Sequence, residues 1–212
     1  MPLPFLYPKK IHRRTQRPPV RNTVAFYGPH LRTEFDGRCV YCCFPDTVGP
    51  PGTFEIDHYK PESRDQTLRA TYSNLYYACR KCNRTKGDYW PTPEERAAGC
   101  VIVNPCDHRM AGHLQYAGAQ VEPSSAEGHW TVALLFLNDE EWALVRETII
   151  GVIESANQDL WDLKKDLDLL RSEIDKESPG SARYHQLDAA LASTIAQIDV
   201  VRVRRLRLGA GY

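Results

Sequence analysis

Apolar residues recur at helical spacing in the C-terminal third of the chain. From Leu144 to Ile174 they return every three or four residues, and between Tyr184 and Val201 they do so again. This period is typical of amphipathic helices. The sequence SPG at 178–180 separates the two runs, because proline lacks an amide donor and glycine is conformationally permissive. The pattern therefore predicts an antiparallel helical hairpin over residues 138–212.

The beginning of the first predicted helix carries a capping signal. Asn138 is followed three residues later by Glu141, which is the spacing of a capping box. We interpret the apolar stripe as packing between the two helices of the hairpin. A docking face for a partner protein, or for a second copy of the chain, is the alternative interpretation.

The part of the chain before the hairpin is divided by its composition. Residues 1–30 are rich in proline and basic residues, which oppose a packed core, so we expect an extended N-terminal arm. Residues 31–95 carry five of the cysteines and the dense polar motifs. Residues 96–137 combine proline, glycine and histidine with short apolar pieces such as CVIVNP and TVALLFLN. They predict loops and short strands that pack on the preceding unit.

Composition and targeting signals restrict the class of protein. The chain has 212 residues, of which 42% are hydrophobic and 25% charged, which excludes a disordered or fibrous protein. It contains no apolar run of about 18 residues and no N-terminal segment with the pattern of a signal peptide. We therefore expect no membrane-spanning helix and a cytoplasmic location.

The neutral net charge hides two halves of opposite sign. Residues 1–99 contain 16 Lys and Arg against 10 Asp and Glu, a balance of +6, whereas residues 100–212 contain 11 against 17, a balance of −6. A basic half suits a polyanionic partner such as nucleic acid.

Four of the seven cysteines form two C-x-x-C pairs. They are Cys39 with Cys42 and Cys79 with Cys82. Each pair places two thiolates on one side of a tight turn, so together they predict a tetrahedral structural zinc site. Cys43 competes with Cys42, but the two-residue spacing favours Cys42. We interpret the other two, Cys100 and Cys106, as structural or free thiols.

A second polar cluster follows the cysteine motifs. It contains Asn104, Cys106, Asp107, His108 and His113. Its spacing does not match an established metal-binding pattern, so we predict a loop that packs against the unit carrying the cysteines rather than a second metal site.

The segment between and around the cysteine pairs resembles a known family. The first pair is CVYC, the intervening stretch contains IDHYKP and YSNL, and the second pair continues as CRKCNRTKGD. From Cys39 to Asp88 these segments resemble the HNH endonucleases, in the form with two C-x-x-C knuckles. The third motif position, often histidine in the family, is Asn83 here. The resemblance implies an α+β fold: a ββα-metal, treble-clef-like unit with zinc knuckles, followed in this chain by the helical extension.

The resemblance also implies the roles of the site residues. His58 would act as the general base that activates water. Asp57 and Asn83 would supply oxygen ligands to a catalytic Mg²⁺ or Mn²⁺ ion. Asn74 would orient the His58 ring through its side-chain oxygen. The basic side chains expected to contact phosphates beside the cleavage point are Lys60, Arg84 and Lys86.

The function that follows is metal-dependent hydrolysis of phosphodiester bonds, most simply in DNA. The layout also resembles bacterial HNH proteins of anti-phage defence, some of which work beside an ATPase subunit; a homodimer through the C-terminal helices is a further expectation. Two other classes remain open: a non-catalytic zinc-binding nucleic-acid module, and a structural subunit of a larger complex.

Overall fold

The computed structural model describes residues 5–49 and 52–208. The chain divides into two compact units, and the boundary falls between Glu147 and Thr148. The larger unit contains all seven cysteines, and the smaller one contains most of the predicted hairpin. The outer ends of the predicted arm and hairpin, residues 1–4 and 209–212, lie outside the described residues.

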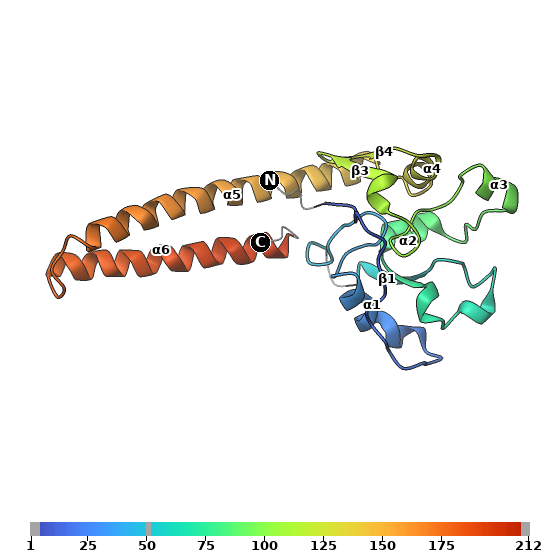
Figure 1. Cartoon of the computed structure of the whole chain (residues 1–212), viewed down its shortest axis with the longest axis horizontal. Coiled ribbons are helices and arrows are strands. Elements are labelled where there is room, and N and C mark those ends of the chain that lie inside the picture. Colours follow the sequence, from blue (N-terminus) through green and yellow to red (C-terminus); the bar gives the residue numbers. More distant parts are fainter. Residues whose placement is uncertain (1–4, 50–51, 209–212) are drawn as a thin grey trace. The chain divides into compact units, whose positions relative to one another are not determined.

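The larger unit combines short helices with two small antiparallel sheets (Figure 1), which confirms the predicted α+β class. One sheet pairs β1 (Phe54–His58) with β2 (Leu75–Cys79), and the other pairs β3 (Leu114–Ala117) with β4 (Gln120–Pro123). Its α-helices are α1 (Gly28–Glu34), α2 (Arg80–Lys86), α3 (Pro93–Ala97) and α4 (Ala126–Leu134), and its 3₁₀ turns are η1 (Val24–Tyr27), η2 (Gln66–Leu68), η3 (Tyr72–Asn74) and η4 (Met110–Gly112).

Strands β1 and β2 and helix α2 form the expected ββα arrangement. Phe54 lies opposite Cys79 at one end of the strand pair, and His58 lies opposite Leu75 at the other. Helix α2 begins directly after β2, and the Cys79 sulfur accepts a hydrogen bond from the amide of Cys82 at 3.5 Å. The second cysteine pair therefore also caps the helix that carries Asn83.

Aromatic side chains from distant segments fix the loop of the first cysteine pair. Tyr116 of β3 donates its hydroxyl to the Cys42 carbonyl at 2.7 Å, and Tyr7 donates to the Tyr41 carbonyl at 3.1 Å. The rings of Tyr7 and Tyr116 stack with centroids 5.1 Å apart. Burial raises the pKa of both phenols, so they remain neutral donors.

The proline-rich N-terminal segment packs along the larger unit. The Arg14 guanidinium lies over the rings of Phe35, Tyr72 and Tyr76 at 5.0, 4.9 and 4.7 Å. It also donates to the Leu75 carbonyl at 2.8 Å. These contacts join the segment to β2, so residues 5–30 and the cysteine-bearing region belong to one unit.

A buried carboxylate anchors the same segment to α1. The Glu34 side chain accepts hydrogen bonds from the amides of Thr15 and Gln16 at 2.8 and 2.9 Å, and lies 2.8 Å from the His12 ring. Although burial alone raises a carboxyl pKa, these hydrogen bonds outweigh it and lower the pKa of Glu34 to about 2. Ionised Glu34 therefore stabilises the folded segment.

Residues 96–137 include the expected loops and short strands, but one expectation here is wrong. The run TVALLFLN begins inside α4 rather than in a strand. Ser125 caps this helix by accepting the amide of Gly128 at 3.0 Å. Thr131 in the same helix is fully buried and accepts a hydrogen bond from the amide of Val103. The run TVALLFLN thus begins in a capped helix that buries one polar side chain. This explains why its apolar residues do not alternate with polar ones as they would in a strand.

The predicted polar loop after the cysteine motifs is built around Asn104, which is fully buried. Its side-chain oxygen accepts hydrogen bonds from the Tyr76 hydroxyl at 3.0 Å and from the amides of Cys106 and Asp107 at 3.0 and 3.1 Å. These bonds fasten the loop to β2.

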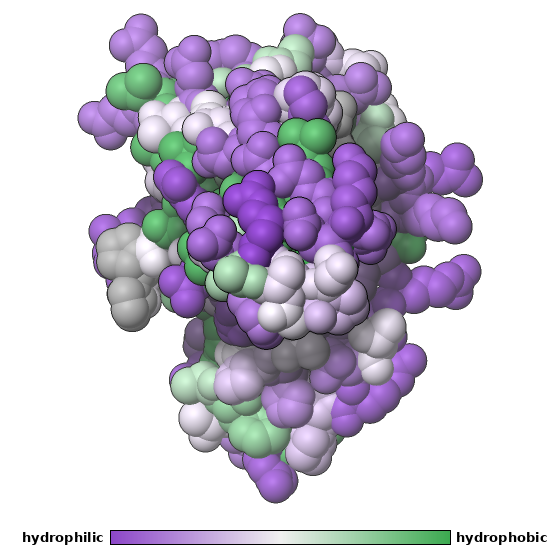
Figure 2. All heavy atoms as spheres, turned by 90° about the vertical axis from the view of Figure 1, so that its left-hand side faces the viewer, coloured by the Kyte–Doolittle hydropathy of each residue, from purple (hydrophilic) through white to green (hydrophobic). Residues whose placement is uncertain are grey.

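The smaller unit is a helical hairpin, as the apolar spacing predicts. Helix α5 (Glu140–Ile174) starts in the larger unit and runs on into the smaller, where α6 (Ala182–Arg207) packs antiparallel to it (Figure 1). The buried seam of this unit contains Ile149, Ile153, Ala156, Leu160, Leu187 and Ile198. The face of the molecule drawn in Figure 2 is mainly hydrophilic. Across the described ranges, no helix is both long and apolar enough to cross a membrane.

The capping box predicted at Asn138 does not form. Asn138 instead bonds both the amide and the carbonyl of Val121, at 2.7 and 2.8 Å. Asp139 takes the capping role, because its Oδ1 accepts the amides of Glu141 and Trp142 at 3.1 and 3.4 Å. Asn138 thus ties β4 to the beginning of α5.

Prediction from the buried carboxylate. We expect Glu34→Gln to lower the free energy of unfolding, and the difference from the wild type to depend on pH. Because the folded pKa of Glu34 is depressed, its contribution is present above the unfolded pKa of about 4.5 and is lost as pH falls toward about 2. Urea unfolding of both proteins from pH 7 to pH 3 measures the difference. A gap that stays constant over this range would contradict the assignment.

Candidate active site and zinc centre

The four cysteines of the two C-x-x-C pairs converge in space. Their sulfur atoms all lie within 4.8 Å of one another, and those of Cys42 and Cys79 are 3.7 Å apart. Zinc–sulfur bonds of about 2.3 Å in a tetrahedron require sulfurs about 3.8 Å apart. All four side chains are buried. The set therefore fits a structural zinc ion, as the spacing predicts.

Cys43 lies outside this set although it follows Cys42 directly. Its backbone has a positive φ of 53°, which turns the chain after the first pair. Burial raises the pKa of its thiol to about 12. Among the residues that the structure describes, no second group of three or more His, Cys, Asp or Glu is arranged to hold a metal.

The alternation of β1 divides the predicted catalytic residues between two faces. Glu55 and Asp57 share the face on which α2 packs, since they bond Asn83 and Lys86 of that helix. His58 is the next residue along the strand, so its side chain leaves from the opposite face. The structure therefore brings together two carboxylates and α2, with the imidazole at the end of the strand.

Asp57 lies in a buried position in which each of its carboxylate oxygens accepts a hydrogen bond. It is 2% exposed, and its Oδ1 accepts a hydrogen bond from the Lys86 ammonium at 2.8 Å. Its Oδ2 accepts a hydrogen bond from the Tyr41 hydroxyl. Burial and the neighbouring carboxylate raise the pKa of Tyr41, which keeps it a donor. Asp57 thus links the first cysteine loop to α2.

Lys86 requires a correction. The sequence places it among the phosphate contacts, but its side chain is only 1% exposed. Its ammonium donates to Asp57 and also to the His58 carbonyl, at 2.7 Å. A lysine held in this way neutralises a buried carboxylate and positions the end of β1 instead of reaching a phosphate.

Asn83 pairs with Glu55, a carboxylate that is not among the site residues predicted from the sequence. Its amide nitrogen donates to Glu55 Oε2 at 2.8 Å, while Arg80 Nε donates to Glu55 Oε1 at 2.8 Å. Partial burial raises the pKa of Glu55, but these hydrogen bonds and the positive charge of Arg80 outweigh it and lower the pKa. The strand period of two that relates Glu55 to Asp57 is the signal that identifies it from sequence.

His58 is half-buried beside the connection that follows β1. Its Nε2 lies 2.8 Å from the Arg69 carbonyl, just after η2. With Nε2 protonated and donating to that carbonyl, Nδ1 is the nitrogen that can accept a proton. A backbone carbonyl therefore selects the tautomer of this imidazole.

Asn74 has a different partner from the one expected. Its side-chain oxygen accepts the Lys60 amide at 2.9 Å, and its side-chain nitrogen donates to the Lys60 carbonyl at 3.0 Å. The expected bond from this oxygen to the His58 ring is replaced by a clamp on the backbone two residues farther along. Asn74 thus positions the chain that leaves His58 and is itself 8% exposed.

The other two residues predicted to contact phosphates, Lys60 and Arg84, differ in how available their side chains are. Lys60 forms an ion pair with Asp65 at 2.9 Å and lies 5.7 Å from the centre of the Trp90 ring. Arg84 is exposed on α2, one residue beyond Asn83. Arg84 is therefore the more available of the two to a polyanion.

Comparison with protein families decides the nature of this segment. Residues 39–89 match the family model described as HNH endonuclease. We refer to this segment as the HNH unit after this match. The match covers almost the same residues as the resemblance in the sequence, and all four cysteines of the cluster lie within it. Searches of the curated proteins and of the solved structures gave no match.

The donor chemistry of the HNH unit bears on a catalytic ion. Carboxylate and amide oxygens are the ligands that Mg²⁺ and Mn²⁺ prefer, and Glu55, Asp57 and Asn83 supply them from one face. Each carboxylate oxygen has two lone pairs, so Asp57 retains acceptor capacity beside its two bonds. Because Asp57 is buried and paired with Lys86, the oxygens of Asn83 and Glu55 are more accessible to a divalent ion than those of Asp57.

Prediction for the zinc centre. Cys82→Ser should reduce bound zinc from one ion per chain to almost none, because the tetrahedron loses a thiolate. The HNH unit should then lose cooperative thermal unfolding. Metal analysis and calorimetry measure both effects. The matched control is Cys43→Ser, which should retain the zinc; equal zinc loss in the two variants would contradict the assigned ligand set.

Prediction for the buried ion pair. Lys86→Met should destabilise the protein by about 3–5 kcal/mol, since it leaves the Asp57 carboxylate buried without its counter-charge. Arg84→Met on the exposed side of the same helix should change stability by no more than about 0.5 kcal/mol. Urea unfolding compares the two. Equal effects would show that Lys86 is not the partner of Asp57.

Proposed function

We propose that the protein is a metal-dependent endonuclease that hydrolyses phosphodiester bonds, with DNA as its substrate. The observation that carries this proposal is the HNH match over residues 39–89, in which His58 stands at the end of β1, half-buried, with its tautomer selected by the Arg69 carbonyl. A neutral imidazole with an unprotonated ring nitrogen is suited to accept a proton from water.

The other residues of the unit divide the remaining work. Asn83 and Asp57, joined by Glu55, would hold the divalent ion, Mg²⁺ or Mn²⁺, which as a Lewis acid supplies neutralisation of charge on the phosphate when bound. Asn74 would act as a positioning residue, because its clamp on Lys60 fixes the chain that follows His58. Arg84 and, on release from Asp65, Lys60 would contact the flanking phosphates.

A non-catalytic zinc-binding nucleic-acid module is the second candidate. The observation in its favour is the state of Asp57, whose two oxygens are bonded to Tyr41 and Lys86 in the interior. A carboxylate used in this way stabilises the fold without any catalytic ion. The two candidates differ in whether the unit cuts the nucleic acid that it binds.

The wider setting is part of the same proposal. We place the protein in the cytoplasm, in bacterial anti-phage defence, where it would work beside a partner such as an ATPase subunit or as a homodimer through its C-terminal helices. The support is the layout of the chain, an HNH unit followed by an acidic helical hairpin, together with the absence of a membrane-spanning helix in the described residues.

Prediction for catalysis. With supercoiled plasmid and Mg²⁺ or Mn²⁺, the full chain should convert the plasmid to nicked or linear forms, and EDTA should prevent this. His58→Ala should lower the rate by about 10²–10⁴-fold, because the general base is lost, while bound zinc is retained. His185→Ala, an exposed histidine of α6, is the control and should cut as the wild type does.

Wild-type protein that binds DNA without cutting it, or a His58→Ala variant as active as the wild type, would contradict the endonuclease proposal. The first outcome supports the non-catalytic module. The same assay with single-stranded RNA in place of the plasmid tests the choice of DNA as substrate.

A further inference from the structure

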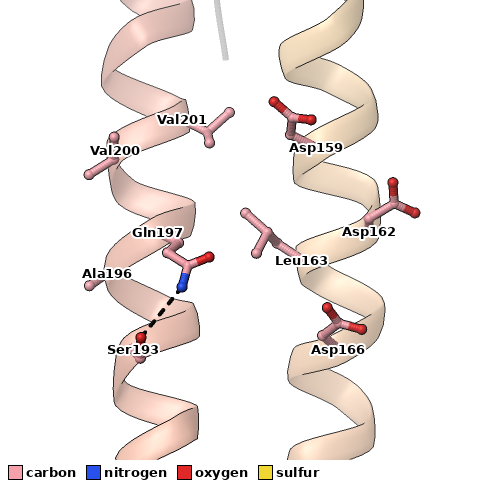
Figure 3. A pocket seen from close by; sticks show the side chains of 9 residues that line it. All are labelled: Asp159, Asp162, Leu163, Asp166, Ser193, Ala196, Gln197, Val200 and Val201. Carbon is pink, nitrogen blue, oxygen red and sulfur yellow. Dashed lines mark hydrogen bonds between the residues drawn. The ribbon is translucent and has the colours of Figure 1, made fainter.

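A groove runs along the smaller unit between α5 and α6. One part has a volume of about 580 Å³ and is floored by Leu163 and Val201, which point into the space between the helices (Figure 3). A second part of about 720 Å³ lies farther toward the end of α6 and begins at Val152 on α5. Val200 lines both parts, so they meet at this residue.

The two parts of the groove carry opposite charges. The α5 wall of the first part presents three carboxylates, those of Asp159, Asp162 and Asp166 (Figure 3). The second part presents Arg204 and Arg207. Asp199, which also lines the second part, is paired with Arg202 at 3.3 Å. The groove is therefore acidic on one side of Val200 and basic on the other.

Apolar surface lies along the line where the two parts meet. Val200 is 69% exposed and Val203 is 49% exposed, and Ala196 lies one helical turn before Val200 on α6. Exposed apolar side chains on a pair of helices favour association, because covering them with a second surface removes apolar area from water. Within residues 148–208 of this unit, which the structure describes, both valines remain exposed.

We propose that this groove is the interface through which two copies of the chain dimerise. A two-fold axis through Val200 would place the two valines against each other and lay the acidic part of one groove on the basic part of the other. A two-fold interface requires a self-complementary patch, and a surface that reverses its charge about a central apolar point meets that requirement. A uniformly basic or acidic partner would meet repulsion at one of the two parts.

The proposal specifies the homodimer named above and does not depend on nuclease activity, so its test does not use DNA. Sedimentation equilibrium of the full chain over about a hundredfold range of concentration should show a monomer–dimer equilibrium. Val200→Asp should raise the dissociation constant at least about tenfold, because it buries two like charges at the axis. Ile195→Asp is the matched control, since Ile195 is an exposed apolar residue of the same helix that lines neither part, and it should leave the constant unchanged.

Charge reversal provides a second test that a folding defect cannot imitate. Asp162→Arg alone and Arg204→Asp alone should each weaken the homodimer, because like charges then face each other. An equimolar mixture of the two variants should form a heterodimer, because every facing pair is again of opposite sign. Circular dichroism checks that each variant keeps its helices.

Three results would overturn the proposal. The first is a wild-type chain that stays monomeric over the whole concentration range. The second is a dimer that Val200→Asp and Ile195→Asp affect equally. The third is a pair of charge-reversal variants that do not associate when mixed.

Discussion

The convergence of four buried cysteine side chains is the interaction on which the rest of the larger unit depends. The two cysteine pairs are separated by 36 residues in the sequence, yet the Cys42 and Cys79 sulfurs lie 3.7 Å apart. Four sulfurs at such distances match the ligand set of a tetrahedral zinc ion, which would neutralise their charge as thiolates. A zinc ion held by these cysteines would close the loop that contains β1, β2 and their connection, and would fix the first turn of α2 through Cys79 and Cys82.

The site residues derive their positions from this closure. Once α2 is fixed at its beginning, Asn83 meets Glu55, and Lys86, one turn farther along, meets Asp57. The Asp57–Lys86 pair then holds the far end of the helix to β1, where a buried ion pair is costly to break. His58, next to Asp57, is carried on the opposite face of a strand that is fastened at both ends. The position of the His58 backbone thus depends on contacts that neighbouring residues make.

The surrounding segments serve the same arrangement. Tyr7 and Tyr116 hold the first cysteine loop, and Arg14 stacks on the aromatic rings of Phe35, Tyr72 and Tyr76. The N-terminal arm that the sequence predicts to be extended therefore uses at least one of its arginines to stabilise the HNH unit. The helical hairpin is a separate compact unit with its own buried seam. The charge division of the sequence does not follow the two units, because residues 1–147 contain 18 Lys and Arg against 17 Asp and Glu, and residues 148–212 contain 9 against 10.

The sequence by itself determined the elements whose signals are local. Helical periodicity and the SPG break predicted the hairpin. The spacing of the two C-x-x-C pairs predicted the metal site, because each pair supplies two of the four ligands of a tetrahedral zinc ion from one tight turn. Tertiary structure alone decided how the polar residues pair. Whether Lys86 reaches a phosphate or neutralises Asp57, whether Asn74 bonds His58 or Lys60, and whether Asn138 or Asp139 caps α5 depend on side chains from distant strands competing for the same donors and acceptors. Burial decides that competition, because an unpaired polar group costs more in the interior than in water, and local sequence contains no record of which groups are buried together.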